Sequence, residues 1–140
     1  MDEAPLTETE SGLVPAGEGW FVVNVRDAEW WTSKTFGSGT VFETKGFPFR
    51  QLGINIAVMQ PGEPNCLYHS ESLQEDFLVL SGECKLLVEG EERLLRAWDF
   101  VHCPPGAAHV VDVESPDAVA AAGGFVEELA HRDERHSVFS

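Results

Sequence analysis

Between residues 52 and 113 the chain alternates short apolar runs with turns that contain glycine or proline. Over residues 52–59 one set of side chains alternates with another at period two, which is the period of a β-strand. The first set is Leu52, Ile54, Ile56 and Val58, and the second is Gly53, Asn55, Ala57 and Met59. Further apolar runs follow at residues 77–80, 84–88, 93–96, 100–103 and 109–113, and the last lies at 118–124. Short strands at such close spacing are typical of an all-β sandwich or barrel.

The 140 residues fit one domain, with a less regular segment at each end. Residues 1–19 are acidic and aperiodic, which predicts a flexible or loosely docked N-terminal arm. The barrel is expected over 20–126, with a first strand in the apolar run 21–25. Residues 127–140 form a charged tail, and helical spacing of apolar residues from Phe125 predicts a short helix there.

The formal net charge of −15 disfavours two classes of partner. Nucleic acid and anionic membranes would both be repelled, and no cluster of Lys or Arg offers a local exception. No apolar run is long enough to cross a membrane, and the acidic start does not resemble a signal peptide. Three cysteines without a CxxC pair predict free thiols, so we expect a cytoplasmic protein.

Three residues of the strand-rich region have the side chains of a metal site: His69, Glu75 and His109. Imidazole and carboxylate bind borderline divalent metals, and three such ligands leave coordination positions open for a substrate. A carboxylate buried in a barrel without a partner is costly, and a cation removes that cost. The alternative is a metal-free pocket in which Glu75 forms hydrogen bonds with both histidines.

Neighbouring residues offer rival ligands and one candidate for catalysis. Glu71 lies two residues after His69 and could replace Glu75 as the carboxylate ligand. Cys66 lies three residues before His69, where a thiolate would favour zinc, although a cysteine of this kind is more often a small buried apolar residue. Tyr68 is the only tyrosine, and its phenol could act as an acid or bind a substrate, or serve only in packing.

The order of these residues resembles the two motifs of the cupin superfamily, a family of small antiparallel jelly-roll barrels. The first motif has a Gly, a His-x-His pair, a Glu, six residues and a Gly, and the chain has Gly62, His69, Glu75 and Gly82. The second has a Gly, five residues, Pro-x-Gly, two residues and a His, and the chain has Trp98, Pro104-Pro105-Gly106 and His109. The resemblance implies an all-β, single-domain double-stranded β-helix.

The chain departs from the cupin pattern at specific positions. Counted back from His69, Leu67 stands where the first His of the pair belongs, and one extra residue separates His69 from Glu75. Counted forward from Gly62, Tyr68 stands at that place. Trp98 replaces the Gly that opens the second motif. The usual four ligands are therefore reduced to three at most: His69, Glu75 and His109.

The resemblance implies two functions of different classes. One is a small-molecule metalloenzyme of dioxygenase or isomerase type, with a single divalent ion of Fe, Mn, Ni or Zn. The other is a non-catalytic cupin that binds or senses a small molecule in a vestigial metal pocket.

The run Phe77–Leu80 predicts the oligomeric state. It is apolar at four consecutive positions, so both faces of its strand are apolar. One barrel interior covers only one face, so we expect a homodimer.

Overall fold

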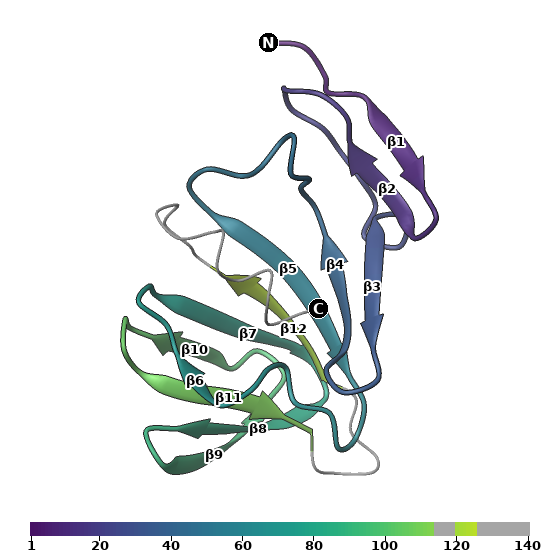
Figure 1. The fold of residues 1–140 in the computed structure, drawn as a ribbon. Helices are drawn as coiled ribbons and strands as arrows, with labels where there is room; N and C mark the ends of the chain where they lie inside the picture. Colours follow the sequence, from purple (N-terminus) through teal and green to yellow (C-terminus); the bar gives the residue numbers. More distant parts are fainter. Residues whose placement is uncertain (114–119, 126–140) are drawn as a thin grey trace.

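The computed structural model describes residues 1–113 and the backbone of residues 120–125 (Figure 1). These residues contain no helix. They form twelve strands: β1 (Leu6–Thr9), β2 (Gly12–Pro15), β3 (Glu29–Ser33), β4 (Gly37–Val41), β5 (Gly53–Met59), β6 (His69–Ser70), β7 (Glu75–Ser81), β8 (Glu83–Val88), β9 (Glu91–Arg96), β10 (Phe100–Cys103), β11 (Ala108–Asp112) and β12 (Ala120–Phe125).

Two antiparallel sheets make up the jelly-roll barrel. One has six strands in the order β10-β7-β12-β5-β4-β3, and the other has four in the order β6-β11-β8-β9. Neighbours in a sheet are mostly distant in sequence, as β7 beside β10 and β6 beside β11 illustrate (Figure 1). The fold therefore brings segments that lie about forty residues apart into one small volume.

Side chains of both sheets meet in one hydrophobic core. Strand β7 shows how the sequence produces it, since Glu75, Phe77 and Val79 are buried while the residues between them are only partly covered. The buried core residues are Met59, Phe77, Val79, Cys84, Leu86, Leu95, Cys103, Val111 and Val113. Among the described residues the buried polar ones are Thr40, Glu75 and His109, and Glu75 is the first residue of β7.

Tight turns join the strands at the positions predicted by the glycine pattern. Glu89 and Gly90 connect β8 to β9 and both have positive φ, of 49° and 78°. A two-residue loop with this conformation at both positions matches the twist of a β-hairpin. Trp98, which replaces a motif glycine, also has a left-handed backbone, with φ of 73°.

The N-terminal segment, predicted as a flexible or loosely docked arm, has regular structure. Strands β1 and β2 form a hairpin that packs against the segment leading to β3. Ala4, Val14 and Ala28 are buried there. Gly12, with φ of 136°, makes this docking possible because its α-carbon lies close to the carbonyl oxygen of Ala28. None of the hairpin residues belongs to the main core, so the acidic segment folds as a small separate layer.

The strand predicted at residues 21–25 is wrong. A turn follows directly, because the Asn24 side chain accepts a hydrogen bond from Arg26 N, and Asn24 O accepts from the next two amides. Phe21 instead stacks on Phe49 at 6.2 Å between ring centroids. The helix and charged tail predicted after Phe125 lie outside the described residues.

No helix long and apolar enough to cross a membrane occurs in the part of the chain that the structure describes.

Candidate metal centre

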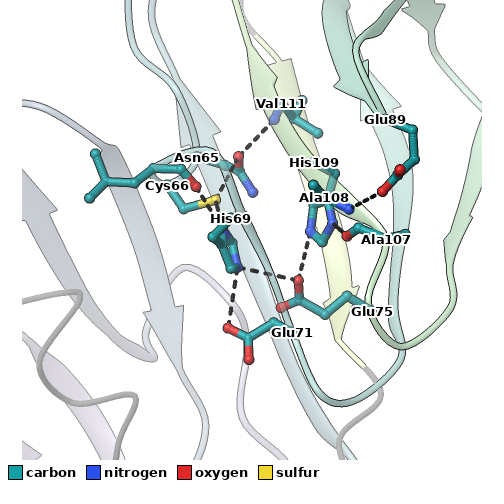
Figure 2. A network of polar contacts seen from close by, with 11 residues as sticks. Asn65, Cys66, His69, Glu71, Glu75, Glu89, Ala107, Ala108, His109 and Val111 are labelled. Carbon is teal, nitrogen blue, oxygen red and sulfur yellow. Dashed lines mark hydrogen bonds and ion pairs between the residues drawn. The ribbon is translucent and has the colours of Figure 1, made fainter.

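The three predicted ligands come together where the two sheets face each other. His69 on β6 and His109 on β11 are direct antiparallel partners in the four-stranded sheet. Glu75 is the first residue of β7 in the six-stranded sheet. Figure 2 shows the carboxylate of Glu75 pointing at both imidazole rings.

The polar atoms of these three side chains lie close together. His109 Nε2 lies 2.7 Å from Glu75 Oε2, and His69 Nε2 lies 3.7 Å from the same oxygen. The two imidazole centroids are 5.1 Å apart. One ligand atom from each of the three residues lies within 4.8 Å of the others.

Backbone carbonyls fix both rings with Nε2 turned towards Glu75. His69 Nδ1 lies 2.6 Å from Leu67 O, and His109 Nδ1 lies 2.9 Å from Ala107 O. A carbonyl can only accept, so each Nδ1 carries the proton and donates. Such a partner orients the ring and leaves the lone pair of Nε2 available to a metal ion.

The group is buried on one side and open on the other. The side chains of His109 and Glu75 are 1% and 9% exposed, whereas that of His69 is 28% exposed. Phe77 packs edge-on against His109, with ring centroids 5.4 Å apart. His69 is therefore the member of the group that is most accessible from solvent.

The pKa of His109 reflects opposing effects of this environment. Burial lowers it, but the hydrogen bond to Glu75, the bond to Ala107 O and the nearby carboxylates outweigh burial and raise the pKa above its ordinary value. In the absence of an ion, a proton on Nε2 joins His109 to Glu75. A divalent cation would take the place of that proton.

Cys66 contacts the side of the His69 ring that faces away from Glu75, so it cannot share an ion with the other residues. Its Sγ is 3.4 Å from Nδ1 of His69, the nitrogen opposite the one that faces Glu75 (Figure 2). Burial, followed by the charges of Glu75 and Glu71, raises the pKa of this thiol to about 12. Cys66 is therefore a packing residue beneath the His69 ring.

The loop that carries Cys66 is held by a residue that the sequence did not single out. Asn65 Oδ1 accepts a hydrogen bond from Val111 N at 2.8 Å, and Asn65 N donates to Val111 O at 2.7 Å. These bonds attach the loop to β11 just before His69. A lone Asn in an irregular loop carried no periodic signal that could have revealed this function.

The remaining candidates lie at the edge of the group or outside it. Glu71 Oε1 is 3.2 Å from His69 Nε2. Tyr68 is about half exposed, as expected for a neighbour of an inward-facing residue on an extended backbone. His102 is half exposed on the outer face of β10, where it pairs with Asp76 at 2.6 Å.

The donor set fits a divalent cation. A buried carboxylate, two imidazoles with oriented Nε2 atoms and a partly open side are the features that hold such an ion while leaving positions free. His69, Glu75 and His109 would be its ligands.

The geometry agrees with a comparison of the sequence with known families. Residues 55–136 match the sequence profile of the cupin domain, which covers more than half of the chain. The chain belongs to the cupin family. No curated protein sequence matches it significantly.

Solved structures of similar fold have low sequence identity to this chain. The polyketide cyclase RemF from Streptomyces resistomycificus superposes with a TM-score of 0.64 at 14% identity, over 75% of this chain and 77% of that one. KdgF from Halomonas sp. gives 0.56 at 16% identity, over 71% and 89%. A cupin protein from Bacteroides fragilis gives 0.53 at 17% identity, over 61% and 72%. These similarities support the fold of this cupin and leave its reaction open.

Proposed function

We propose that this cupin is a small-molecule metalloenzyme with one divalent ion held by His69, Glu75 and His109. The observation that carries the proposal is the convergence of two Nε2 atoms on a carboxylate that is buried at the junction of the sheets. A structural ion pair alone would not require both rings to be locked by carbonyls in the tautomer that a metal needs.

When bound, the ion supplies Lewis-acid or redox chemistry at its open positions. The residues of this chain orient the substrate and exclude water. Phe77 and the apolar core below it keep water away from the His109 side, and the exposed edge of His69 admits the substrate. The polyketide cyclase RemF has a similar fold, so an isomerase or cyclase reaction on a small organic molecule is a class to screen first, beside dioxygenation.

Asn55 is a candidate for substrate binding inside the barrel. It lies on the face of β5 that also carries buried Met59, and Oδ1 is buried with no hydrogen-bond partner in the part of the chain that the structure describes. Gly123 of β12 pairs with Ile56 on one side and with Leu78 of β7 on the other. Asn55 and Phe77 each precede one of these two residues, so they lie at the same level of the sheet. A donor group of a substrate would satisfy this oxygen.

A metal-free binding protein is the second candidate. The observation in its favour is the 2.7 Å hydrogen bond between His109 and Glu75, which satisfies the carboxylate without an ion. In that case the same pocket would bind a small molecule by hydrogen bonds alone.

The metal content of purified protein separates the two candidates. The protein is prepared without chelators or a His tag, and metals are quantified by mass spectrometry for wild type, His109→Ala and His102→Ala. His102 is the matched control, because it is a histidine of the same barrel that pairs with Asp76 outside the group. We expect about one ion per chain in wild type and in His102→Ala, and loss of that ion in His109→Ala.

Two results would contradict the proposed enzyme. Equal metal in all three proteins would place the ion elsewhere. Absence of metal even after reconstitution with Fe, Mn, Ni and Zn would favour the metal-free binding protein, and ligand screening would then replace assays of turnover.

A further inference from the structure

His69 of β6 and Glu71, the first residue after β6, are alternate residues of one extended segment. Side chains alternate along an extended backbone, and Ser70 between them is exposed, so His69 and Glu71 share a face. The backbone stays paired beyond the end of the strand, because Gly106 N donates to Glu71 O at 2.7 Å. The Pro104-Pro105-Gly106 turn of the second motif thus holds Glu71 in place.

The Glu71 carboxylate faces the ring nitrogen that the metal centre uses. Oε1 lies 3.2 Å from His69 Nε2, closer than the 3.7 Å that separate this nitrogen from Glu75 Oε2 (Figure 2). Leu67, which stands where the missing first His of the motif was expected, is 64% exposed. The carboxylate beside His69 Nε2 thus comes from a residue after His69 in the sequence, whereas Leu67 before it is exposed to solvent.

We propose that Glu71 is a fourth metal ligand and takes the place of the second His of the cupin pair. The inference rests on the proposed metal centre and extends it. With His69 as the first member and Glu71 as the second, the extra residue before Glu75 disappears, and one extra residue follows Gly62 instead. An insertion in the loop between β5 and β6 is easier to accommodate than one between the ligands.

The donor set would then be two imidazoles and two carboxylates. Two negative charges neutralise a divalent cation, and replacing an imidazole by a carboxylate shifts preference towards harder ions such as Mn(II) and Fe(II). We therefore expect a smaller advantage of Zn(II) over Mn(II) than a site with a third histidine would show.

Manganese titration of chelator-treated full-length protein tests this ligand directly. Free Mn(II) is followed by electron paramagnetic resonance, and the number of waters on the bound ion is obtained from water-proton relaxation. Glu71→Gln removes the charge and the strong donor, and Asp76→Asn is the matched control, since it removes a carboxylate next to Glu75 that pairs with His102 instead.

We expect Glu71→Gln to raise the Kd for Mn(II) by more than about 100-fold, the upper end of what loss of an outer-shell partner costs. The bound ion should also gain one water. Asp76→Asn should change the Kd by less than about threefold, since Asp76 lies on the opposite face of β7 from Glu75 and contacts Gln74 and His102 instead. An unchanged number of waters in Glu71→Gln would show that Glu71 only positions His69, and would overturn the inference.

Two histidine substitutions test which position belongs to the missing ligand. Glu71→His should bind Mn(II) with a Kd close to that of wild type and should raise the ratio of Zn(II) to Mn(II) affinity. Leu67→His should leave both quantities unchanged. Tighter binding by Leu67→His, together with indifference to Glu71→Gln, would place the missing ligand at residue 67 and contradict the inference.

His109→Ala, measured in the same titration, separates failure of this inference from failure of the metal centre. If wild type binds Mn(II), His109→Ala does not, and Glu71→Gln keeps its number of waters, only the fourth ligand is wrong. If wild type binds no ion or His109→Ala binds as wild type does, the metal centre itself is wrong and the inference falls with it. Circular dichroism and melting temperatures of all variants confirm that each is folded.

Discussion

The hydrogen bond between His109 and Glu75 dominates the chemistry of the pocket at the scale of single residues. Both groups are nearly inaccessible to solvent, and a buried carboxylate without a partner would be costly. Their spacing of 2.7 Å satisfies the carboxylate in the metal-free protein and places the same two atoms correctly for an ion. Proton and metal therefore compete for one place, so metal affinity should decrease as pH falls.

Trp98 is a strained residue that a single substitution should relieve. It has φ of 73° and is largely exposed, so a left-handed backbone costs about 1–2 kcal/mol without much packing in return. Trp98→Gly also makes the unfolded chain more flexible, which offsets about 0.4–1 kcal/mol of the stability gained by relieving the strain. We expect a net increase of about 0.5–1 kcal/mol in the free energy of unfolding, measured by urea denaturation.

The reverse change provides the control for this prediction. Gly90 has a similar φ of 78°, and a β-carbon there would meet no atom within 4 Å. Gly90→Ala should therefore destabilise by about 1 kcal/mol through backbone strain alone. A Trp98→Gly protein less stable than wild type would mean that packing of the indole outweighs the strain.

Cys84 should make stability depend on pH in the alkaline range. Burial, followed by the charges of Asp112 and Asp99, raises the pKa of this thiol from 9.0 to about 11. Above pH 9 the unfolded chain loses the proton while the folded chain retains it, so the stability present below pH 9 is lost as pH rises towards 11. The loss is at most about 3 kcal/mol.

Comparison with Cys84→Ala isolates this contribution. The free energy of unfolding of both proteins is measured by urea denaturation between pH 8 and 11. The difference between wild type and variant should shrink as pH rises. A difference that stays constant over this range would show that the thiol has no altered pKa in the folded protein.

At the scale of elements, the β1–β2 hairpin depends on a close approach of two backbones. A β-carbon on Gly12 would lie 2.2 Å from Ala28 O, and its φ of 136° disfavours any other residue. Gly12→Ala should detach the hairpin and expose Ala4 and Val14, at a cost of about 2 kcal/mol or more. Limited proteolysis should then cut within residues 1–28 faster than in wild type.

Gly46→Ala is the matched control, because a β-carbon there meets nothing within 4 Å. Its proteolysis pattern should equal that of wild type. Resistance of Gly12→Ala to proteolysis, with an unchanged melting temperature, would contradict the docking of the hairpin.

Strands with a clear period could be predicted from the sequence, whereas elements held by single contacts could not. The alternation over residues 52–59 and the glycine turns after residues 80 and 88 correspond to β5, β7, β8 and β9. The hairpin at residues 6–15 was missed because acidic composition suggests a disordered segment, while its strands pair through the backbone, which composition does not report. The opposite error occurred at Phe21–Val25, where the Asn24 turn overrides apolar composition.

The candidate ligands could be predicted from the sequence, but the groups that hold them in place could not. Motif spacing selected His69, Glu75 and His109, which the fold brings within reach of one another. The carbonyls of Leu67 and Ala107 and the side chain of Asn65 fix this arrangement. Backbone carbonyls are present at every residue, so only the folded chain shows which of them matter.

At the scale of the whole molecule, the outer face of the six-stranded sheet is rich in apolar side chains. Phe100 of β10 is 64% exposed and is paired in register with Leu78 of β7. On β5, buried Met59 places Ile54, Ile56 and Val58 on the outer face, and Ile54 is half exposed. A monomer that exposed all of these would be prone to association.

We therefore predict a homodimer that forms through this face. Light scattering at micromolar concentration should give twice the chain mass of 15.4 kDa, and Phe100→Glu should shift the protein towards the monomer, because it introduces a charge into the interface. Leu94→Glu is the control, since Leu94 is exposed on the edge strand of the other sheet. A monomeric wild type, or dissociation by Leu94→Glu alone, would contradict this interface.

The most direct measurement of the central claim is an anomalous-difference map from crystals of the manganese-loaded protein, collected at the manganese absorption edge. We predict one peak per chain, in coordination contact with His69 Nε2, Glu75 Oε2 and His109 Nε2. A strong peak elsewhere, or none between these three atoms in crystals that contain manganese, would show that the His-Glu-His group is not a metal centre.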